Sequence, residues 1–250
     1  LLIGTIAIIG TQYKDEVVSF VKNELSKKLT REVKVGKIEY NLFSNFPNIS
    51  VDLINLETYS FKPGDIPFFQ LNKVHLVFDI MPLIKGDFQI GEIILEEGQV
   101  NVINDAKQNI NFNILKETAD SNSSKSLFSI EILRLKNIEV TYQNWKELQS
   151  YSVSFQECSV FPSSIIESID ASIIFSGKIP SLDVGGFTLQ KSIDLEGDFK
   201  IGLSNDSLIF NYLGQFGSGD IDLDGRIYFH DKKEDWDIKF NLLNQDISHI

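Results

Sequence analysis

The spacing of hydrophobic residues along the chain changes once, near residue 32. Over residues 13–31 the apolar side chains recur at three- and four-residue steps, which is the spacing of one face of an α-helix. Lys27, Lys28 and Arg31 fall in the last turns of this segment, where cations interact favourably with the helix dipole. We therefore predict an amphipathic helix that packs on the structure following it. Its apolar stripe consists of Val17, Phe20, Val21, Leu25 and Leu29.

From residue 32 onward, apolar and polar residues alternate with a period of two. The clearest case runs from Ile193 to Ile201, where every odd position is apolar or Gly and every even position is charged. Strands of this kind have one wet face and one dry face, which is typical of antiparallel sheets. No segment with helical period separates them, so a parallel sheet is not expected. The apolar sets that we assign to the dry side are Val74, Leu76, Phe78, Ile193, Leu195, Phe199, Ile201, Ile221, Leu223, Ile227 and Phe229.

The sequence thus predicts a mainly β fold in which N-terminal helical structure leads into a curled, one-faced antiparallel β-sheet. The dry side of such a sheet has to be removed from water. Either it faces a second sheet in a closed β-sandwich, or it forms an open groove that shelters lipid tails. Both arrangements bury the same residues, so the pattern leaves the choice open.

The first ten residues carry no charge. As a helix they span about 15 Å, or about half of a bilayer core. Tyr13 and the charges from Lys14 onward follow, as expected where a chain leaves a membrane. The predicted organisation is the C-terminal part of a membrane anchor over 1–12, a helix and first β segment over 13–115, a polar Ser-rich linker or long loop over 116–127, and further β repeats over 128–250 that continue beyond Ile250.

A faint internal repeat accompanies the strands. Residues 95–102 align with residues 135–142 at an offset of 40, and in each copy an apolar strand end meets a short polar turn before alternation resumes. Repeats of this size are typical of stacked β units.

The composition restricts the possible partners. The formal net charge is −12, with 23 Lys and Arg against 35 Asp and Glu. Nucleic-acid binding needs clustered cations, so this balance argues against it. The hydrophobic share of 42% is enough for a sizeable core. Cys158 is the only cysteine, which excludes an intrachain disulfide.

One segment partly matches the sequence pattern of a calcium-binding loop. Residues 220–225 read Asp-Ile-Asp-Leu-Asp-Gly, which matches the start of a calcium-binding loop, and Asp231 falls at the twelfth position. However, Ile221 and Leu223 continue the two-residue period. We interpret the segment as a strand whose carboxylates face water, and we predict no metal and no cofactor.

No catalytic constellation is found either. His75, His230 and His249 are scattered, and we interpret Cys158 as a buried, inert thiol. Residues 217–219 read Gly-Ser-Gly, but the first Gly of a nucleophile elbow is replaced by Phe216. A hydrolase is therefore disfavoured, and we predict that the protein is not an enzyme.

Four segments resemble the AsmA family. Residues 21–38 look like the opening of those proteins, in which a membrane anchor leads into a helix and a strand, and residues 40–51 are similar to the next element. Residues 78–93 contain Pro82-Leu83-Ile84-Lys85-Gly86, which is similar to the family's proline-leucine-leucine-x-glycine step before a new strand. Residues 109–112 fit where those proteins carry a polar-aromatic strand. The likeness covers about residues 14–115.

The resemblance implies a single-span anchor in a bacterial inner membrane and a periplasmic body. It also implies relatedness to the bridge-like lipid transfer proteins, which build a long curled sheet with an apolar concave side. The expected partners are then a phospholipid or another acyl-chain lipid and the membrane, and the expected role lies in outer-membrane assembly or phospholipid transport. The alternative is a structural or adhesive β-sandwich, tethered to the membrane and without lipid cargo.

Overall fold

A computed structural model of the chain describes residues 14–41, 48–112, 130–165, 168–184, 187–188, 191–204, 206–230 and 233–243. Within these ranges there are two helices, α2 (Lys14–Lys28) and α3 (Ile80–Ile84). The strands are β1 (Lys34–Asn41), β2 (Ile49–Tyr59), β3 (Pro67–Phe78), β4 (Ile90–Asn104), β5 (Ile132–Asn144), β6 (Gln149–Ile165), β7 (Ser168–Val184), β8 (Phe187–Thr188), β9 (Ile193–Ser204), β10 (Ser207–Phe216), β11 (Gly219–His230) and β12 (Lys233–Leu243).

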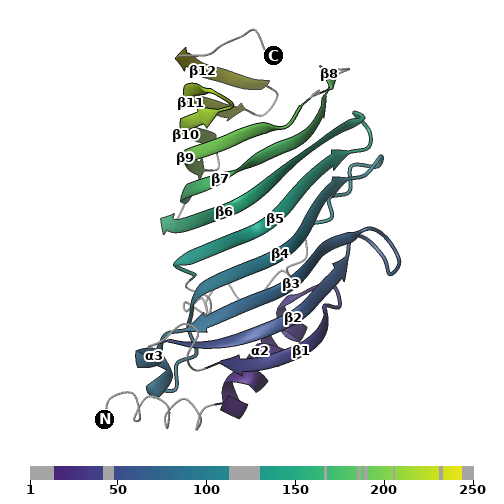
Figure 1. The fold of residues 1–250 in the computed structure, drawn as a ribbon, viewed down its shortest axis with the longest axis vertical. Coiled ribbons are helices and arrows are strands. Elements are labelled where there is room, and N and C mark those ends of the chain that lie inside the picture. Colours follow the sequence, from purple (N-terminus) through teal and green to yellow (C-terminus); the bar gives the residue numbers. More distant parts are fainter. Residues whose placement is uncertain are drawn as a thin grey trace.

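All the described strands belong to one curved sheet. Its order is β1-β2-β3-β4-β5-β6-β7-β9-β10-β11-β12, and the short β8 pairs only with β7. β1 and β12 lie at the two ends of this order, so the sheet is open and not a closed barrel. Figure 1 shows the strands following one another from the N-terminal end to the C-terminal end. The prediction of a mainly β fold is confirmed.

One junction in the sheet is parallel, so the expectation of a wholly antiparallel sheet is wrong there. β4 and β5 run in the same direction, because the long connection between them returns the chain to the starting side of the sheet. Leu95 pairs with Leu135 and Val102 pairs with Tyr142. The offset of 40 seen in the sequence is therefore the register in which the two copies lie side by side.

At one level of the first six strands, the pairing register skips one residue in each strand. Three of them, Asn55, Glu97 and Asn137, have positive φ angles between 53° and 54°. The left-handed conformation of Asn55 interrupts the alternation of sides in β2, so Leu53 and Leu56 both belong to the buried cluster although they lie three positions apart. The residues that the pairing register passes over are Gly36, Asn55, Asn72, Glu97, Asn137 and Gln156.

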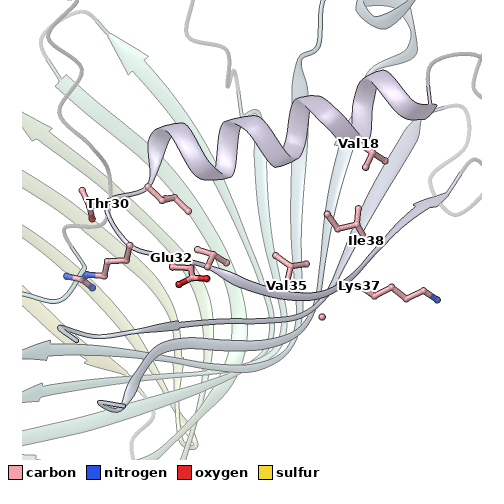
Figure 2. A pocket seen from close by; sticks show the side chains of 10 residues that line it. Val18, Thr30, Glu32, Val35, Lys37 and Ile38 are labelled. Atoms are coloured by element: carbon pink, nitrogen blue, oxygen red, sulfur yellow. The ribbon is translucent and has the colours of Figure 1, made fainter. Parts of the chain in front are cut away.

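Helix α2 lies inside the curve of the sheet, as Figure 2 shows. Asp15 and Glu16 occupy its first turn, where negative charge favours the helix dipole. Val17 and Val21 are buried in one hydrophobic cluster with side chains of β2 and β3. The ring of Phe20 stacks on that of Phe88, with ring centroids 5.2 Å apart. The helix therefore closes the inner side of the sheet at its N-terminal end.

A buried asparagine fastens the chain where β4 ends. The amide of Asn111 donates to Ser60 Oγ (2.9 Å) and to the carbonyl of Asn101 (2.6 Å), and its oxygen accepts from the N–H of Ile103 (2.8 Å). Residues 109–112 do not form the strand that the family resemblance implied. Ile110 makes a single bridge to Asn104, and a turn follows. The Asp105 carboxylate, which accepts from backbone N–H groups of the loop, turns the chain back at this point.

Two predicted segments lie outside the described residues. These are the anchor over 1–12 and the polar linker over 116–127. Among the helices that the structure describes, neither has the length and apolar character needed to cross a bilayer.

Candidate functional site

The most extended chemical feature is one face of the sheet, here called the dry face. Directly paired residues in neighbouring strands point to the same side, so the register identifies which residues share a face. One row of paired residues crosses eleven strands from β1 to β12, and every member is apolar or Gly. The row consists of Ile38, Leu53, Val74, Leu95, Leu135, Cys158, Phe175, Gly197, Gly214, Ile221 and Leu242.

A second row runs beside the first, and each of its members is the sequence neighbour of a residue in the first row. This second row therefore lies on the opposite face of the sheet, here called the wet face. From β1 to β11 it is mostly charged or polar, with Ile54 as an exception, whereas its member in β12 is Leu243. Alternation thus holds across neighbouring strands from β1 to β11 and not only within single strands. The members of this row from β1 to β11 are Lys37, Ile54, Lys73, Glu96, Lys136, Glu157, Ser176, Glu196, Gln215 and Asp220.

The register places all eleven predicted dry-side residues on the dry face, but in two different environments. Val74, Leu76 and Phe78 of β3 belong to the buried cluster that also contains Val17 and Val21 of α2. These three side chains are at most 8% exposed, so α2 and the neighbouring strands already remove them from water. The sequence predicted that the helix packs on the structure following it, but not that it covers these three residues.

The residues from β9 and β11 lie beyond α2. Ile221 and Ile227 are 7% and 8% exposed, whereas Phe229 is 39% exposed. Exposure increases towards the last strand, where Phe240 of β12 is 54% exposed. The other residues predicted for this part are partly buried: Ile193, Leu195, Phe199, Ile201 and Leu223.

Aromatic rings lie over glycines on this second part of the dry face. A Cβ atom at Gly225 would come within 2.0 Å of the ring of Phe210, and one at Gly214 within 2.7 Å of the Tyr212 hydroxyl oxygen. Tyr212 also stacks on Phe175, with ring centroids 6.0 Å apart. Because the glycines carry no side chains, the rings can lie flat along the sheet. The result is a broad apolar surface with few projecting groups.

A pocket lies between α2 and the edge strand β1, and we call it the slot. It has a volume of about 770 Å³, within the usual range of ligand pockets. Figure 2 shows Val18 of α2 and Val35 and Ile38 of β1 directed into the gap, while Lys37 points away from it. The apolar residues that line the slot are Val18, Leu29, Val33, Val35 and Ile38. Sequence reasoning missed the slot, because Val18 lies beside the predicted stripe and not in it.

A network of ion pairs lies on the wet face of β2, β3 and β4. His75 Nδ1 lies 2.8 Å from Asp52 Oδ1, and His75 Nε2 lies 3.0 Å from Glu96 Oε2. Lys73 Nζ approaches the other oxygen of Asp52 to 3.2 Å, and Lys136 lies 3.4 Å from Glu96. The hydrogen bond with His75, followed by the charges of His75 and Lys136, lowers the pKa of Glu96. Each ring nitrogen of His75 thus lies within hydrogen-bonding distance of one carboxylate.

Cys158 belongs to the dry-face row and not to a reactive pair. Its side chain is 3% exposed, and burial raises the pKa of the thiol to about 11. Such a thiol stays protonated at neutral pH and is a poor nucleophile. The structure confirms the prediction of a buried thiol, and it shows that Cys158 lies between Leu135 and Phe175.

The segment that imitates a calcium loop is a strand. Residues 219–230 form β11, so Asp220, Asp222 and Asp224 follow one another along the wet face, as predicted. Asp231 lies outside the described residues. Gly217 occupies the turn between β10 and β11 with a φ of 62°, so this glycine closes a hairpin. Among the described residues no group of His, Cys, Asp or Glu side chains is placed to hold a metal ion.

The comparisons with known proteins found no match for this chain. No protein-family model matches the chain, and no curated protein or solved structure is significantly similar to it. Function is therefore inferred from the residues and their geometry.

Proposed function

We propose that the protein is a non-catalytic, membrane-anchored lipid carrier that shelters acyl chains on the dry face of its sheet. The observation that carries this proposal is the unbroken apolar row across eleven strands, of which α2 covers only the N-terminal part. Each methylene group moved from water onto such a surface contributes about 0.8 kcal/mol. Contacts of this kind have no preferred direction, so a chain can slide along them.

The alternative of a closed β-sandwich needs a second sheet against the dry face. The strands within the described ranges all belong to one sheet, and Phe240 and Ile238 of β12 are about half exposed on the dry side. This favours an open groove. Together with the AsmA-like opening, it supports a periplasmic body held at a bacterial inner membrane and a role in phospholipid transport or outer-membrane assembly.

The proposal is tested by native mass spectrometry of protein purified gently from membranes, with Phe199→Asp as the decisive variant. Phe199 is half-buried on the dry face and stacks on Phe210. A carboxylate there would have to be buried against lipid, so we expect lipid capture to fall about tenfold or more. Leu213→Asp is the matched control, because Leu213 is 61% exposed on the wet face of the next strand.

The outcomes separate the two architectures. In an open groove, Phe199→Asp keeps the circular dichroism spectrum of the wild type and loses lipid, while Leu213→Asp keeps both. In a closed core, Phe199→Asp unfolds the protein. Wild-type protein that carries no lipid from several membrane preparations, or a Phe199→Asp variant that carries as much as the control, would refute the carrier.

A further inference from the structure

We propose that three loops at one end of the sheet insert into the surface of a lipid bilayer. This inference goes beyond the proposed function, because it assigns a second surface of the protein and holds with or without a lipid cargo. The loops lie at the same end, because the register places the ends of β2, β4 and β5 beside the starts of β3 and β6. We call them the rim, which consists of the β2–β3 loop (60–66), the turn after β4 (105–112) and the β5–β6 turn (145–148).

Large apolar residues are exposed on all three loops of the rim. Ile66 is 48% exposed, Ile110 43% and Trp145 44%, while Leu148 reaches 83%. Residues of all three loops, Ile66 and Trp145 among them, line one cleft of about 710 Å³, so the loops are neighbours in space. In Figure 1 the β2–β3 loop and the β5–β6 turn project from the same side of the sheet, on the right of the view. Apolar side chains placed in this way can enter the headgroup region of a bilayer together.

Leu148 has a backbone conformation that suits other residue types. Its φ is 54°, in the left-handed region where Gly and Asn are common and a bulky side chain is strained. Because 83% of the residue is exposed, contacts within the protein do little to offset this strain. A large apolar residue that destabilises its own turn and is scarcely packed is expected where it contacts a partner.

Hydrogen bonds hold the rim in place. The N–H of Trp145 donates to the carbonyl of Asn104 (2.9 Å), and the N–H of Ser60 donates to the carbonyl of Ile66 (3.1 Å). The amide of Asn111 joins the turn after β4 to the hydroxyl of Ser60 (2.9 Å). The exposed side chains are therefore presented from preformed loops, so that little conformational entropy is lost on binding.

The charges of the rim favour a lipid surface over a protein partner. The rim carries three lysines and three carboxylates, whereas the whole chain has a net charge of −12. Two of the carboxylates, those of Asp65 and Asp105, accept hydrogen bonds from N–H groups of their own loops. The lysines Lys62, Lys107 and Lys146 are exposed, and none of the ion pairs between described residues involves them.

Lysine is depleted in protein–protein interfaces, whereas lysine beside Trp and Leu is typical of segments that lie in a membrane surface. Trp145, Lys146 and Leu148 combine these residue types within a single turn. The rim therefore fits a bilayer that contains anionic lipid.

The test measures the capture of fluorescent vesicles of phosphatidylethanolamine and phosphatidylglycerol by protein immobilised through an N-terminal tag. Such a tag leaves the rim free, because Phe20 of α2 contacts Phe78, at the end of β3 that is remote from the rim. Leu148→Asn removes the apolar side chain, and asparagine tolerates the left-handed backbone. We expect this variant to melt no lower than the wild type and to bind vesicles about tenfold more weakly. Leu213→Asn is the matched control, because it removes an exposed leucine from the wet face and should capture vesicles like the wild type.

A second variant tests the charge of the rim. Lys146→Gln should weaken capture of these vesicles about fivefold and leave capture of pure phosphatidylcholine vesicles unchanged. Wild-type capture by Leu148→Asn or Lys146→Gln, or a lower melting temperature for Leu148→Asn, would overturn the assignment of the rim. A wild-type protein that captures no vesicles would exclude a bilayer and leave a protein as the partner. Native mass spectrometry of the same samples tests the carrier separately, since vesicle capture without bound lipid contradicts the carrier and not the rim.

Discussion

Replacing His75 by leucine is expected to destabilise the fold, because it removes the imidazole that lies between two carboxylates. Asp52 has 1% of its side chain exposed, and its partners are His75 at 2.8 Å, Lys73 at 3.2 Å and the hydroxyl of Ser50 at 3.3 Å. Breaking a buried ion pair costs about 3–5 kcal/mol when one charge is left without a partner. The expected loss here is smaller, about 2–3 kcal/mol, because Lys73 remains beside Asp52 and Glu96 is partly exposed.

A double-mutant cycle separates the pair from its surroundings. When Asp52→Leu accompanies His75→Leu, no carboxylate stays buried opposite the lost imidazole, and apolar replacement of a buried ion pair is often close to neutral. The double variant should therefore be more stable than His75→Leu alone, with a coupling energy of about 2 kcal/mol. Asp198→Asn is the control, because Asp198 is exposed on the wet face and should change stability by less than about 0.5 kcal/mol.

Urea unfolding at pH 7, followed by circular dichroism, gives the free energies of unfolding for this cycle. A His75→Leu variant as stable as the wild type, or two single changes whose effects simply add, would show that the network does not hold these strands together.

Two further outcomes follow from the titrating groups. The pKa of Glu96 is lower in the folded protein than in the unfolded chain, so Glu96 stabilises the fold at pH values above its unfolded pKa. This contribution is lost as pH falls through the folded pKa, so the difference in urea midpoint between wild type and Glu96→Gln should shrink in acid; a constant difference would contradict the assignment. Cys158, whose thiol pKa is raised to about 11, should react with a thiol reagent at pH 8 only as fast as the protein unfolds; rapid labelling of the native protein would show that its part of the dry face opens.

The strands and their two faces were predictable from the sequence because alternation is a local signal. Residues 193–201 alternate strictly, and they form most of β9 with their apolar members less exposed than their charged ones. The repeat at an offset of 40 also had a structural counterpart, since it is the register between β4 and β5. The direction of that pairing was not predictable, because one-faced alternation is typical of antiparallel strands, and yet the parallel pair β4 and β5 carries it.

The cover over the dry face and the ion network depend on long-range placement. Nothing in the pattern of Val74, Leu76 and Phe78 distinguishes a side chain under α2 from one in an open groove. In the same way, His75 finds its partners 23 positions earlier and 21 positions later, at Asp52 and Glu96. Only the register of three strands brings these groups together.

The in-register pairing of β4 with β5 makes the size of the sheet adjustable. Removing the forty residues from Glu92 to Glu131 would join Gly91 directly to Ile132. β5 would then take the place of β4 and lie antiparallel beside β3, with every side chain on its original face. Duplicating the same forty residues would add a strand by the same geometry. Duplication or deletion of this unit could therefore lengthen or shorten the dry face in unit steps, without any change at β1 or β12.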